Sequence, residues 1–239
     1  GTWGMDKINM KTSAGIPYVM KGLDKEDLIS FDENGVVDQL HPFLMSRLDV
    51  NWMLLDNGNQ MDVTYATSAK DELRPLEKVL SSKTRAIEAC PLDFTIIARV
   101  MWGSAITFFQ TNPSFTTGIA VGIDPDSDWD SLFKAMKRIG DIGLDLDFTN
   151  FDASISPFMI KSAVDLLGKM CGNSELHNLS LFNAICYSRH QILDMVYTVE
   201  GSMPSGTPCT SLLNSIINNF CLYYVFSQVL QIRPCQVKE

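Results

Sequence analysis

Residues 201–219 read GSMPSGTPCTSLLNSIINN, a loop rich in glycine and proline followed by a helical pattern. Glycine and proline let such a loop turn sharply, so its backbone can approach a ligand closely. A helix is predicted over residues 209–228, and Thr210, Asn214 and Asn218 recur every four residues along it. Because asparagine is a poor residue for a helix interior, this polar row favours a face that meets a polar ligand. The alternative is an ordinary helix with a solvent-exposed polar stripe.

Residues 143–152, GLDLDFTNFD, form the second informative stretch. The alternation predicts a strand over Gly143–Phe148, with its leucines on one face and Asp145 and Asp147 on the other. Carboxylates on a buried strand need a cation or a hydrogen-bond donor, and Mg²⁺ is held by one or two carboxylates plus substrate phosphates. Asp152 follows the strand and can face another part of the same ligand. A solvated strand end with helix-capping acids is the alternative.

Residues 70–85, KDELRPLEKVLSSKTR, concentrate positive charge in a chain whose net charge is −9. The five basic residues are Lys70, Arg74, Lys78, Lys83 and Arg85. Guanidinium and ammonium groups gathered on a segment broken by proline can clamp a triphosphate. The interleaved acids permit the alternative of a salt-bridged surface, which this segment favours when it is considered alone.

The composition is that of an ordinary globular protein, with 46% hydrophobic and 20% charged residues. The negative net charge opposes binding of nucleic acid over the whole surface, so any such contact must come from a local basic patch. No apolar run is expected to cross a bilayer, since the longest candidate covers only residues 220–232. The start of the chain lacks the apolar stretch of a signal peptide and is expected to be an interior cut. Six scattered cysteines predict free thiols, and no histidine or cysteine spacing typical of a metal site is found.

The remaining patterns predict a mixture of helices and antiparallel strands. Helices are expected over residues 91–109, which is apolar on most faces, over 129–140 at the surface, and over 156–170 behind a serine cap. Residues 190–200 alternate as a β-hairpin does, and residues 1–60 are expected to be irregular with helical pieces. The fold class is therefore α+β.

Four segments in this order resemble the conserved motifs of picornavirus RNA-dependent RNA polymerases. Thr12–Val19 resembles motif G, Lys70–Arg85 motif F, Asp147–Asp152 motif A and Ser205–Asn214 motif B. The strings KDELRPLEKV, FDASISPFMI and GSMPSGTPCTSLLNSIINN are long and specific, and GLDLDF and EKVLSSKTRAIEACP are most similar to the hepatovirus branch. The resemblance covers nearly the whole chain and implies a right-hand polymerase.

The resemblance implies that the chain holds the fingers and the N-terminal half of the palm. The implied division is fingers over residues 1–101, palm over 102–185, a fingers insertion over 186–202 and palm again over 203–239. The family's motif C contains Gly-Asp-Asp, but this sequence has no adjacent pair of aspartates. Motif C and the thumb are therefore expected beyond the chain, and the chain alone is expected not to polymerise RNA.

The resemblance also implies the chemistry, which is two-metal transfer of ribonucleotides to a primer 3′-hydroxyl during replication of a viral RNA genome. Asp147 would be the catalytic residue that holds two Mg²⁺ ions, or Mn²⁺. Asp152, with Ser205, Thr210 and Asn214, would hydrogen-bond the ribose of the incoming nucleotide and favour RNA over DNA substrates. A 2′-hydroxyl can satisfy such a network, because it both donates and accepts hydrogen bonds.

The phosphate and template contacts are implied in the same way. Three cations would approach the triphosphate and base of the nucleotide, namely Lys70, Arg74 and Arg85. Three residues would contact the RNA template, namely Gly15, Pro17 and Gly206. The implied partners are template and primer RNA, ribonucleoside triphosphates, the remaining polymerase chain and a viral protein primer. The implied location is the host cytoplasm, at membrane-associated replication complexes.

Two rival hypotheses remain at this stage. Asp145-Leu-Asp147-Phe-Thr149 fits the D-x-D-x-T signature of haloacid-dehalogenase-type phosphotransferases, with Asp145 as nucleophile. That signature usually opens its domain, whereas here most of the chain precedes it, and the paired acids expected downstream are missing. A non-enzymatic chain that only binds nucleotide or RNA is the other rival.

Overall fold

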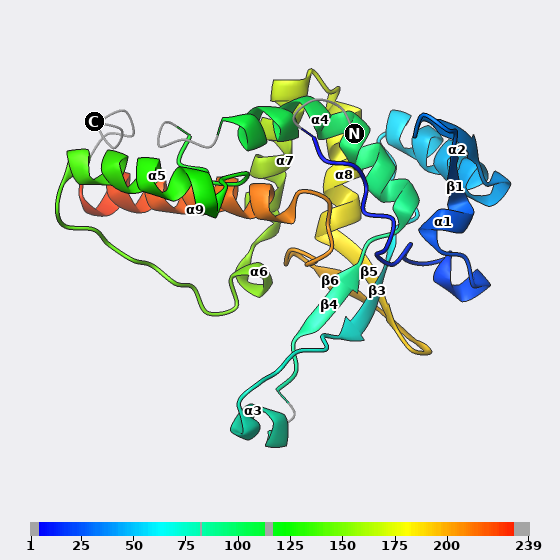
Figure 1. Cartoon of the computed structure of the whole chain (residues 1–239), viewed down its shortest axis with the longest axis horizontal. Coiled ribbons are helices and arrows are strands. Elements are labelled where there is room, and N and C mark those ends of the chain that lie inside the picture. The colour runs from blue at the N-terminus through cyan, green and yellow to red at the C-terminus, as the bar shows by residue number, and fades with distance from the viewer. Residues whose placement is uncertain (1–4, 82, 113–116, 232–239) are drawn as a thin grey trace.

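The computed structural model describes residues 5–81, 83–112 and 117–231, and these residues form a mixed α+β structure, as predicted (Figure 1). The helices are η1 (Val19–Lys21), α1 (Lys25–Leu28), α2 (Pro42–Asp56), α3 (Leu76–Leu80), α4 (Leu92–Thr111), α5 (Pro125–Ile139), α6 (Phe151–Ser154), α7 (Pro157–Cys171), α8 (Glu175–Cys186) and α9 (Thr210–Val229). The strands are β1 (Ile29–Phe31), β2 (Val37–Leu40), β3 (Thr64–Ala69), β4 (Ala86–Ala89), β5 (Tyr187–Ile192) and β6 (Met195–Glu200).

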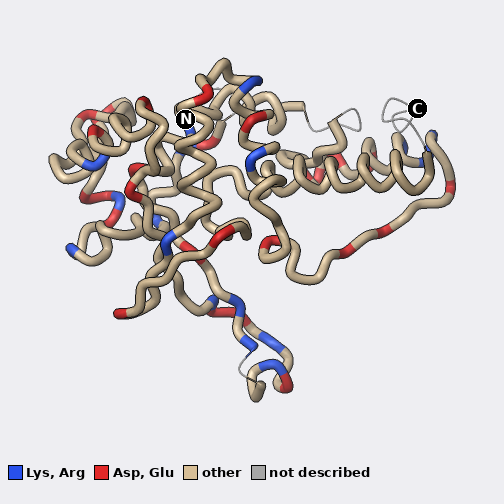
Figure 2. Tube along the Cα trace, turned by 180° about the vertical axis from the view of Figure 1, so that it is seen from behind, with Lys and Arg blue, Asp and Glu red and all other residues tan. Residues whose placement is uncertain are grey.

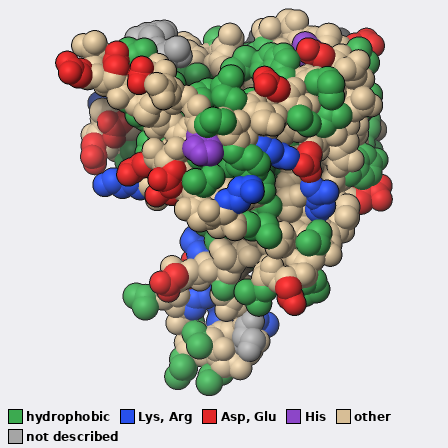
Figure 3. Space-filling model, turned by 90° about the vertical axis from the view of Figure 1, so that its right-hand side faces the viewer, with side chains coloured by type: hydrophobic (Ala, Val, Ile, Leu, Met, Phe, Trp, Pro, Cys, Tyr) green, Lys and Arg blue, Asp and Glu red, His purple; other side chains and the backbone are tan. Residues whose placement is uncertain are grey.

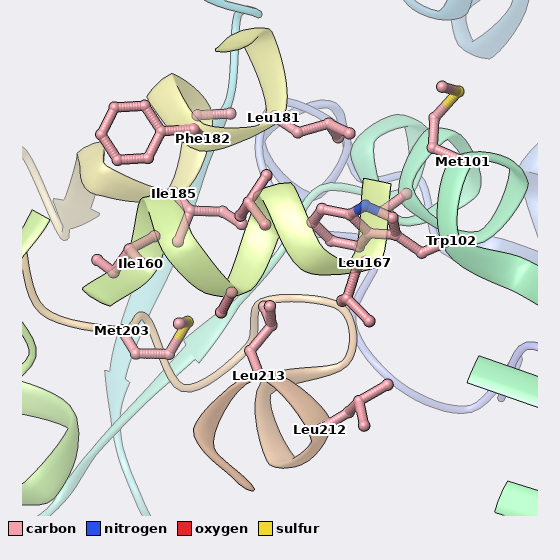
Figure 4. Packing of buried hydrophobic residues seen from close by; sticks show 14 of the residues in the cluster. Met101, Trp102, Ile160, Leu167, Leu181, Phe182, Ile185, Met203, Leu212 and Leu213 are labelled. Carbon is pink, nitrogen blue, oxygen red and sulfur yellow. The ribbon is translucent and has the colours of Figure 1, made fainter. Parts of the chain in front are cut away.

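The main hydrophobic core surrounds α7, which packs against α4, α8 and α9. Figure 4 shows Leu167 of α7 near Trp102 of α4, while Leu213 of α9 lies below α7. All three side chains are fully buried. The predicted cap of α7 is confirmed, since Ser156 Oγ accepts a hydrogen bond from the Met159 backbone N–H. The core fixes α9, and therefore the loop before it, relative to the rest of the molecule.

The prediction that α4 is largely buried is confirmed, but the prediction that no segment could span a membrane needs correction. By length and composition, α4 is long and apolar enough to cross one, and no other helix in the described parts of the chain meets the same test. About half of its most apolar stretch, 56%, is buried inside the protein. Its apolar faces therefore pack in the core of this fold.

A second, smaller core lies at the N-terminal side and contains Tyr18, Leu44 and Leu92. Beside it, the side chain of Asp93 is fully buried and lies 3.2 Å from Arg47 Nη2 and 2.7 Å from Asn51 Nδ2. Burial raises the pKa of Asp93, although Arg47 opposes this effect. This buried pair joins α2 to α4. The 15-residue α2 gives residues 1–60 more regular structure than expected.

The four-stranded sheet has the order β4-β3-β5-β6. β3 pairs antiparallel with β4 and parallel with β5, and the predicted hairpin is confirmed as the antiparallel pair β5–β6. The connection between β3 and β4 forms an arm that includes α3 and extends away from the body. In Figure 2 several Lys and Arg residues lie along this arm, and Figure 3 shows hydrophobic side chains near its tip.

The predicted strand over Gly143–Phe148 is wrong for this structure. The segment between α5 and α6 is extended, but none of the described strands pairs with it. Leu144 and Leu146 are exposed, as are Asp145 and Asp147, so neither face is buried. Alternation reports which residues would share a face, but a strand forms only where a neighbouring strand accepts its hydrogen bonds.

Two other sequence-based expectations concern the chain as a whole. The five cysteines among the described residues are all free thiols, as predicted, and Cys235 lies outside the described residues. The predicted boundary at residues 101 and 102 falls inside the continuous helix α4. The division into fingers and palm therefore remains a prediction about parts of a polymerase rather than about separate compact bodies.

Candidate nucleotide-binding site

The structure brings motif A and motif B together at Asp152 and Asn214. Asn214 Nδ2 donates to Asp152 Oδ1 at 2.6 Å, so the side chain at the start of α6 is tied to α9. The backbone makes a second link, because the Met203 N–H donates to the Asp152 carbonyl at 3.0 Å. Asn214 Oδ1 is buried and has no hydrogen-bond partner among the described residues. An acceptor left in this state is costly, so the pair has capacity for one further donor.

The loop over residues 201–209 is also fastened to the sheet. The Ser205 N–H donates to Glu88 Oε2 at 2.6 Å, and the Glu88 N–H donates to Ser205 Oγ at 3.1 Å. A Cβ atom on Gly206 would lie 1.7 Å from the Glu88 carbonyl oxygen, so only glycine fits there. The Thr207 hydroxyl lies 3.1 Å from the Tyr65 hydroxyl, and both groups are buried. The loop therefore rests on β4 and β3.

Thr210 serves the loop rather than the pair at Asp152. Its Oγ1 donates to the Thr207 carbonyl at 2.6 Å, with longer contacts to the Pro204 and Ser205 carbonyls. This arrangement closes the loop at the start of α9. The loop therefore brings Ser205 and Thr210, two of the predicted ribose contacts, close to each other.

The three predicted phosphate-binding cations converge on one carboxylate, Glu72. Arg85 Nε donates to Glu72 Oε1 at 2.7 Å and Arg85 Nη2 contacts Oε2, while Lys70 and Arg74 lie 3.4 and 3.5 Å from the carboxylate. Hydrogen bonding to Arg85 lowers the pKa of Glu72 to about 2. The sequence left open a salt-bridged surface or a triphosphate clamp, and the structure shows a salt-bridged cluster that gathers the cations a clamp needs.

Asp145 and Asp147 are exposed and make no hydrogen bond or ion pair with any described residue. The described residues also contain no group of three or more His, Cys, Asp or Glu side chains that could hold a metal ion. The carboxylate of Asp147 has the right chemistry for Mg²⁺, but it supplies only one of the ligands such an ion needs. The predicted convergence of Asp147 with Ser205 and Asn214 remains a prediction.

The motif G segment packs against the start of α4. The Leu92 N–H donates to the Ala14 carbonyl at 3.0 Å, and a Cβ atom on Gly15 would lie 2.6 Å from the Cys90 carbonyl oxygen. Gly15 also has φ of +73°, a conformation that favours glycine. Pro17 lies in the turn that follows. The contacts of Gly15, Pro17 and Gly206 with a template remain predictions.

Three residues of this site were not predicted from the sequence: Glu72, Glu88 and His190. Glu72 was counted only among the acids of the basic segment. Period-two alternation along β5 places Ser188 and His190 on one face, and both are buried. That alternation was the available signal for His190, whereas nothing in the sequence connected Glu88 with a loop more than a hundred residues away.

Comparison with known sequences establishes the class of protein to which the motifs point. A model of the viral RNA-dependent RNA polymerase family matches residues 2–237, so the chain belongs to this family.

Among its relatives, the genome polyproteins of simian hepatitis A virus genotype V (isolate AGM-27) and human hepatitis A virus genotype IA (isolate GBM) are each 55% identical over 234 residues. The match covers 98% of this chain and 10% of each polyprotein, and it confirms the expected similarity to hepatoviruses.

The fold agrees with a solved picornavirus polymerase. The Sicinivirus 3Dpol RNA-dependent RNA polymerase matches with a TM-score of 0.77 and 29% sequence identity, over 93% of this chain and 46% of that chain. The chain thus spans about half of that polymerase and a tenth of the polyproteins. The dehalogenase hypothesis for Asp145 is not supported, because residues 145–149 lie inside the polymerase match.

Proposed function

We propose that this chain supplies the nucleotide-binding half of an active site that copies an RNA template. The reaction joins a ribonucleoside triphosphate to a primer 3′-hydroxyl and releases pyrophosphate, during replication of a viral RNA genome. The hydrogen bond between Asp152 and Asn214 carries the proposal, together with the unpaired Asn214 Oδ1. Because that oxygen is buried, a ribose 2′-hydroxyl would reach it only once the covering side chains move aside. It could then donate there, whereas a deoxyribose lacks this group, so the pair would favour RNA precursors.

The triphosphate would bind on the arm between β3 and β4. Lys70, Arg74 and Arg85 already surround an anion, the carboxylate of Glu72, which supports their role in binding phosphate oxygens. Because the net charge is −9, this local cluster matters more than the overall field of the protein.

Asp147 would be the residue of this chain that holds Mg²⁺. When bound, two such ions activate the attacking hydroxyl and neutralise the leaving pyrophosphate. Asp147 would supply one carboxylate and the substrate would supply phosphate oxygens, and the site would need further carboxylates. We therefore propose that the chain alone does not polymerise RNA, in agreement with the absence of an Asp-Asp pair from its sequence.

The proposed partners are template and primer RNA, a viral protein primer, and the rest of the polymerase, with the assembly at membrane-associated replication complexes in the host cytoplasm. Two exposed apolar surfaces support packing against further polymerase chain. One is a groove between α7 and α9, lined by Phe158, Met159, Phe220 and Tyr224. The other is the tip of the arm, with Leu73, Leu76, Val79 and Leu80 exposed.

The proposal is tested by comparing this chain with the longer polymerase that contains it. Primer extension with Mg²⁺ and ribonucleoside triphosphates is expected only from the longer protein, and Asp147→Asn should abolish it. Asp141→Asn is the matched control, because Asp141 lies in the same exposed segment and pairs with Lys137. Full activity in Asp147→Asn would overturn the role of Asp147.

A further inference from the structure

His190 lies where the sheet meets the loop of residues 201–209. Its side chain is only 3% exposed and is held between two aromatic rings. The ring centroids of Tyr65 and Tyr197 lie 5.4 and 5.3 Å away, with interplanar angles of 23° and 14°. Nε2 lies 2.8 Å from Ser188 Oγ. These contacts, from β3, β5 and β6, leave the imidazole little freedom to rotate.

The other ring nitrogen faces Glu88. His190 Nδ1 lies 3.2 Å from Glu88 Oε1, without the alignment of a hydrogen bond. The second carboxylate oxygen of Glu88 accepts the Ser205 N–H. Burial would raise the pKa of Glu88, but the contact with His190 and the N–H of Ser205 outweigh it, so this pKa lies below its ordinary value.

His190 therefore contacts both side chains that hold the loop to the sheet. Glu88 holds Ser205, and Tyr65, on which the imidazole stacks, holds Thr207. The loop in turn donates the Met203 N–H to the carbonyl of Asp152.

The carboxylate of Glu88 is partly withdrawn from water, and three cations of the arm pair with another acid. Its side chain is 19% exposed, so its solvation by water is limited. Arg85, three residues earlier, pairs with Glu72 instead, as do Lys70 and Arg74. The titratable groups that pack around His190 are Glu88 from β4, Tyr65 from β3 and Tyr197 from β6. Among the described residues, His190 is thus the side chain whose ring nitrogen faces the remaining carboxylate oxygen of Glu88.

We propose that His190 is a positioning residue for ribose selection, which acts by holding Glu88 in the orientation that fastens Ser205 and its loop. This inference rests on the proposed polymerase function and adds two residues of the four-stranded sheet to it, His190 and Glu88. His190 and Glu88 do not touch the nucleotide in this proposal. They fix the loop that carries Ser205 and that donates the Met203 N–H to the Asp152 carbonyl.

The test uses the longer polymerase that contains this chain, with the variants His190→Gln, Glu88→Gln and the double variant. Each single variant is expected to lower the ratio of kcat/KM for a ribonucleotide over its deoxyribonucleotide about tenfold, mainly through a higher KM for the ribonucleotide. The double variant should lose no more sugar selection than Glu88→Gln alone. Both changes break the same series of contacts, from His190 through Glu88 to Ser205. Additive losses would overturn the proposal.

Hydrogen exchange separates positioning from general destabilisation. Both single variants should speed exchange of amides in residues 201–208 and leave the hairpin of residues 187–200 protected. His177→Gln is the matched control, because His177 also pairs with a carboxylate, Asp56 at 3.0 Å, but on the outer surface between α8 and α2. Faster exchange throughout the sheet would show a structural role only and overturn the proposal.

Two outcomes keep this inference distinct from the proposed function. Loss of activity in Asp147→Asn tests the polymerase proposal by itself. An active polymerase with unchanged sugar selection in Glu88→Gln would refute only the role of His190. Because the Glu88 side chain is partly exposed, Glu88→Gln provides this result even if His190→Gln does not fold.

Discussion

The side-chain amide of Asn214 lies 2.6 Å from Oδ1 of Asp152, 62 residues away in the sequence. This contact joins the end of motif A, in α6, to the end of motif B, in α9, and leaves Asn214 Oδ1 without a described partner. An amide held by a carboxylate has a fixed orientation, so its free oxygen points in a defined direction. Such a group can distinguish a sugar that carries a hydroxyl from one that does not.

Replacing Asp152 by alanine should therefore weaken sugar selection. The ratio of kcat/KM for ribonucleotide over deoxyribonucleotide is expected to fall about tenfold or more in the longer polymerase, because Asn214 loses the partner that orients it. Single-nucleotide incorporation measures this ratio. Asp165→Ala is the control, since Asp165 pairs with Lys161 at the surface of α7. An unchanged ratio in Asp152→Ala would argue against the proposed ribose site.

The cation cluster around Glu72 should survive in acid. The pKa of Glu72 is lowered from 4.5 to about 2, so the ionic contacts are present above the ordinary pKa and are lost only as the pH falls through about 2. Titration of the Glu72 carboxyl followed by NMR should give a midpoint well below 4. Arg85→Ala should move the midpoint upward, because Arg85 makes the largest contribution. A midpoint near 4.5 in the unaltered protein would contradict the cluster.

The Gly206→Ala substitution should lift the loop from β4. The new methyl group would lie 1.7 Å from the Glu88 carbonyl oxygen, and this backbone atom cannot move aside without disturbing the sheet. A loss of about 1–3 kcal/mol in unfolding free energy is expected from urea denaturation. Gly140→Ala serves as the control, since its Cβ would meet nothing within 4 Å. Equal stability of the two variants would show that the loop is not fastened there.

Arg47→Ala should be strongly destabilising, by about 3–5 kcal/mol, because it leaves the buried carboxylate of Asp93 without its positive partner. Thermal and urea unfolding measure this change. By contrast, Lys134→Ala removes an exposed pair with Asp130 and should cost less than about 1 kcal/mol. Similar losses of stability in both variants would mean that Arg47→Ala does not leave an uncompensated buried charge at Asp93.

Much of the fold could be predicted, because local patterns report local structure. The serine cap predicted the start of α7, apolar residues on most faces predicted the burial of α4, and alternation predicted the hairpin of β5 and β6. The prediction of a strand over residues 143–148 is wrong, because a strand depends on more than local sequence. Its alternation is real, but the hydrogen bonds of a strand depend on a partner segment, which local sequence does not specify.

The candidate site also has one part that the sequence could predict and another that depends on the tertiary fold. The motifs placed Asp152 and Asn214 in one group of four predicted ribose contacts, and the structure brings these two into contact. The roles of Glu72 and Glu88 depend on which cation reaches which carboxylate across the fold, and such choices follow from tertiary packing. In the sequence, Glu72 was only one of the acids interleaved in the basic segment, and Glu88 was not singled out.

The parallel pairing of β3 with β5 has a consequence for how the chain is made. It joins residues 64–66 to residues 189–191, so the centre of the sheet cannot close until most of the chain has emerged from the ribosome. The β3–β4 pair is local and can form early, carrying the basic arm with it. Closure of so long a loop is slow, and until it occurs one edge of β3 remains open to pairing with other chains. Newly made protein is thus most exposed to misassembly during this interval.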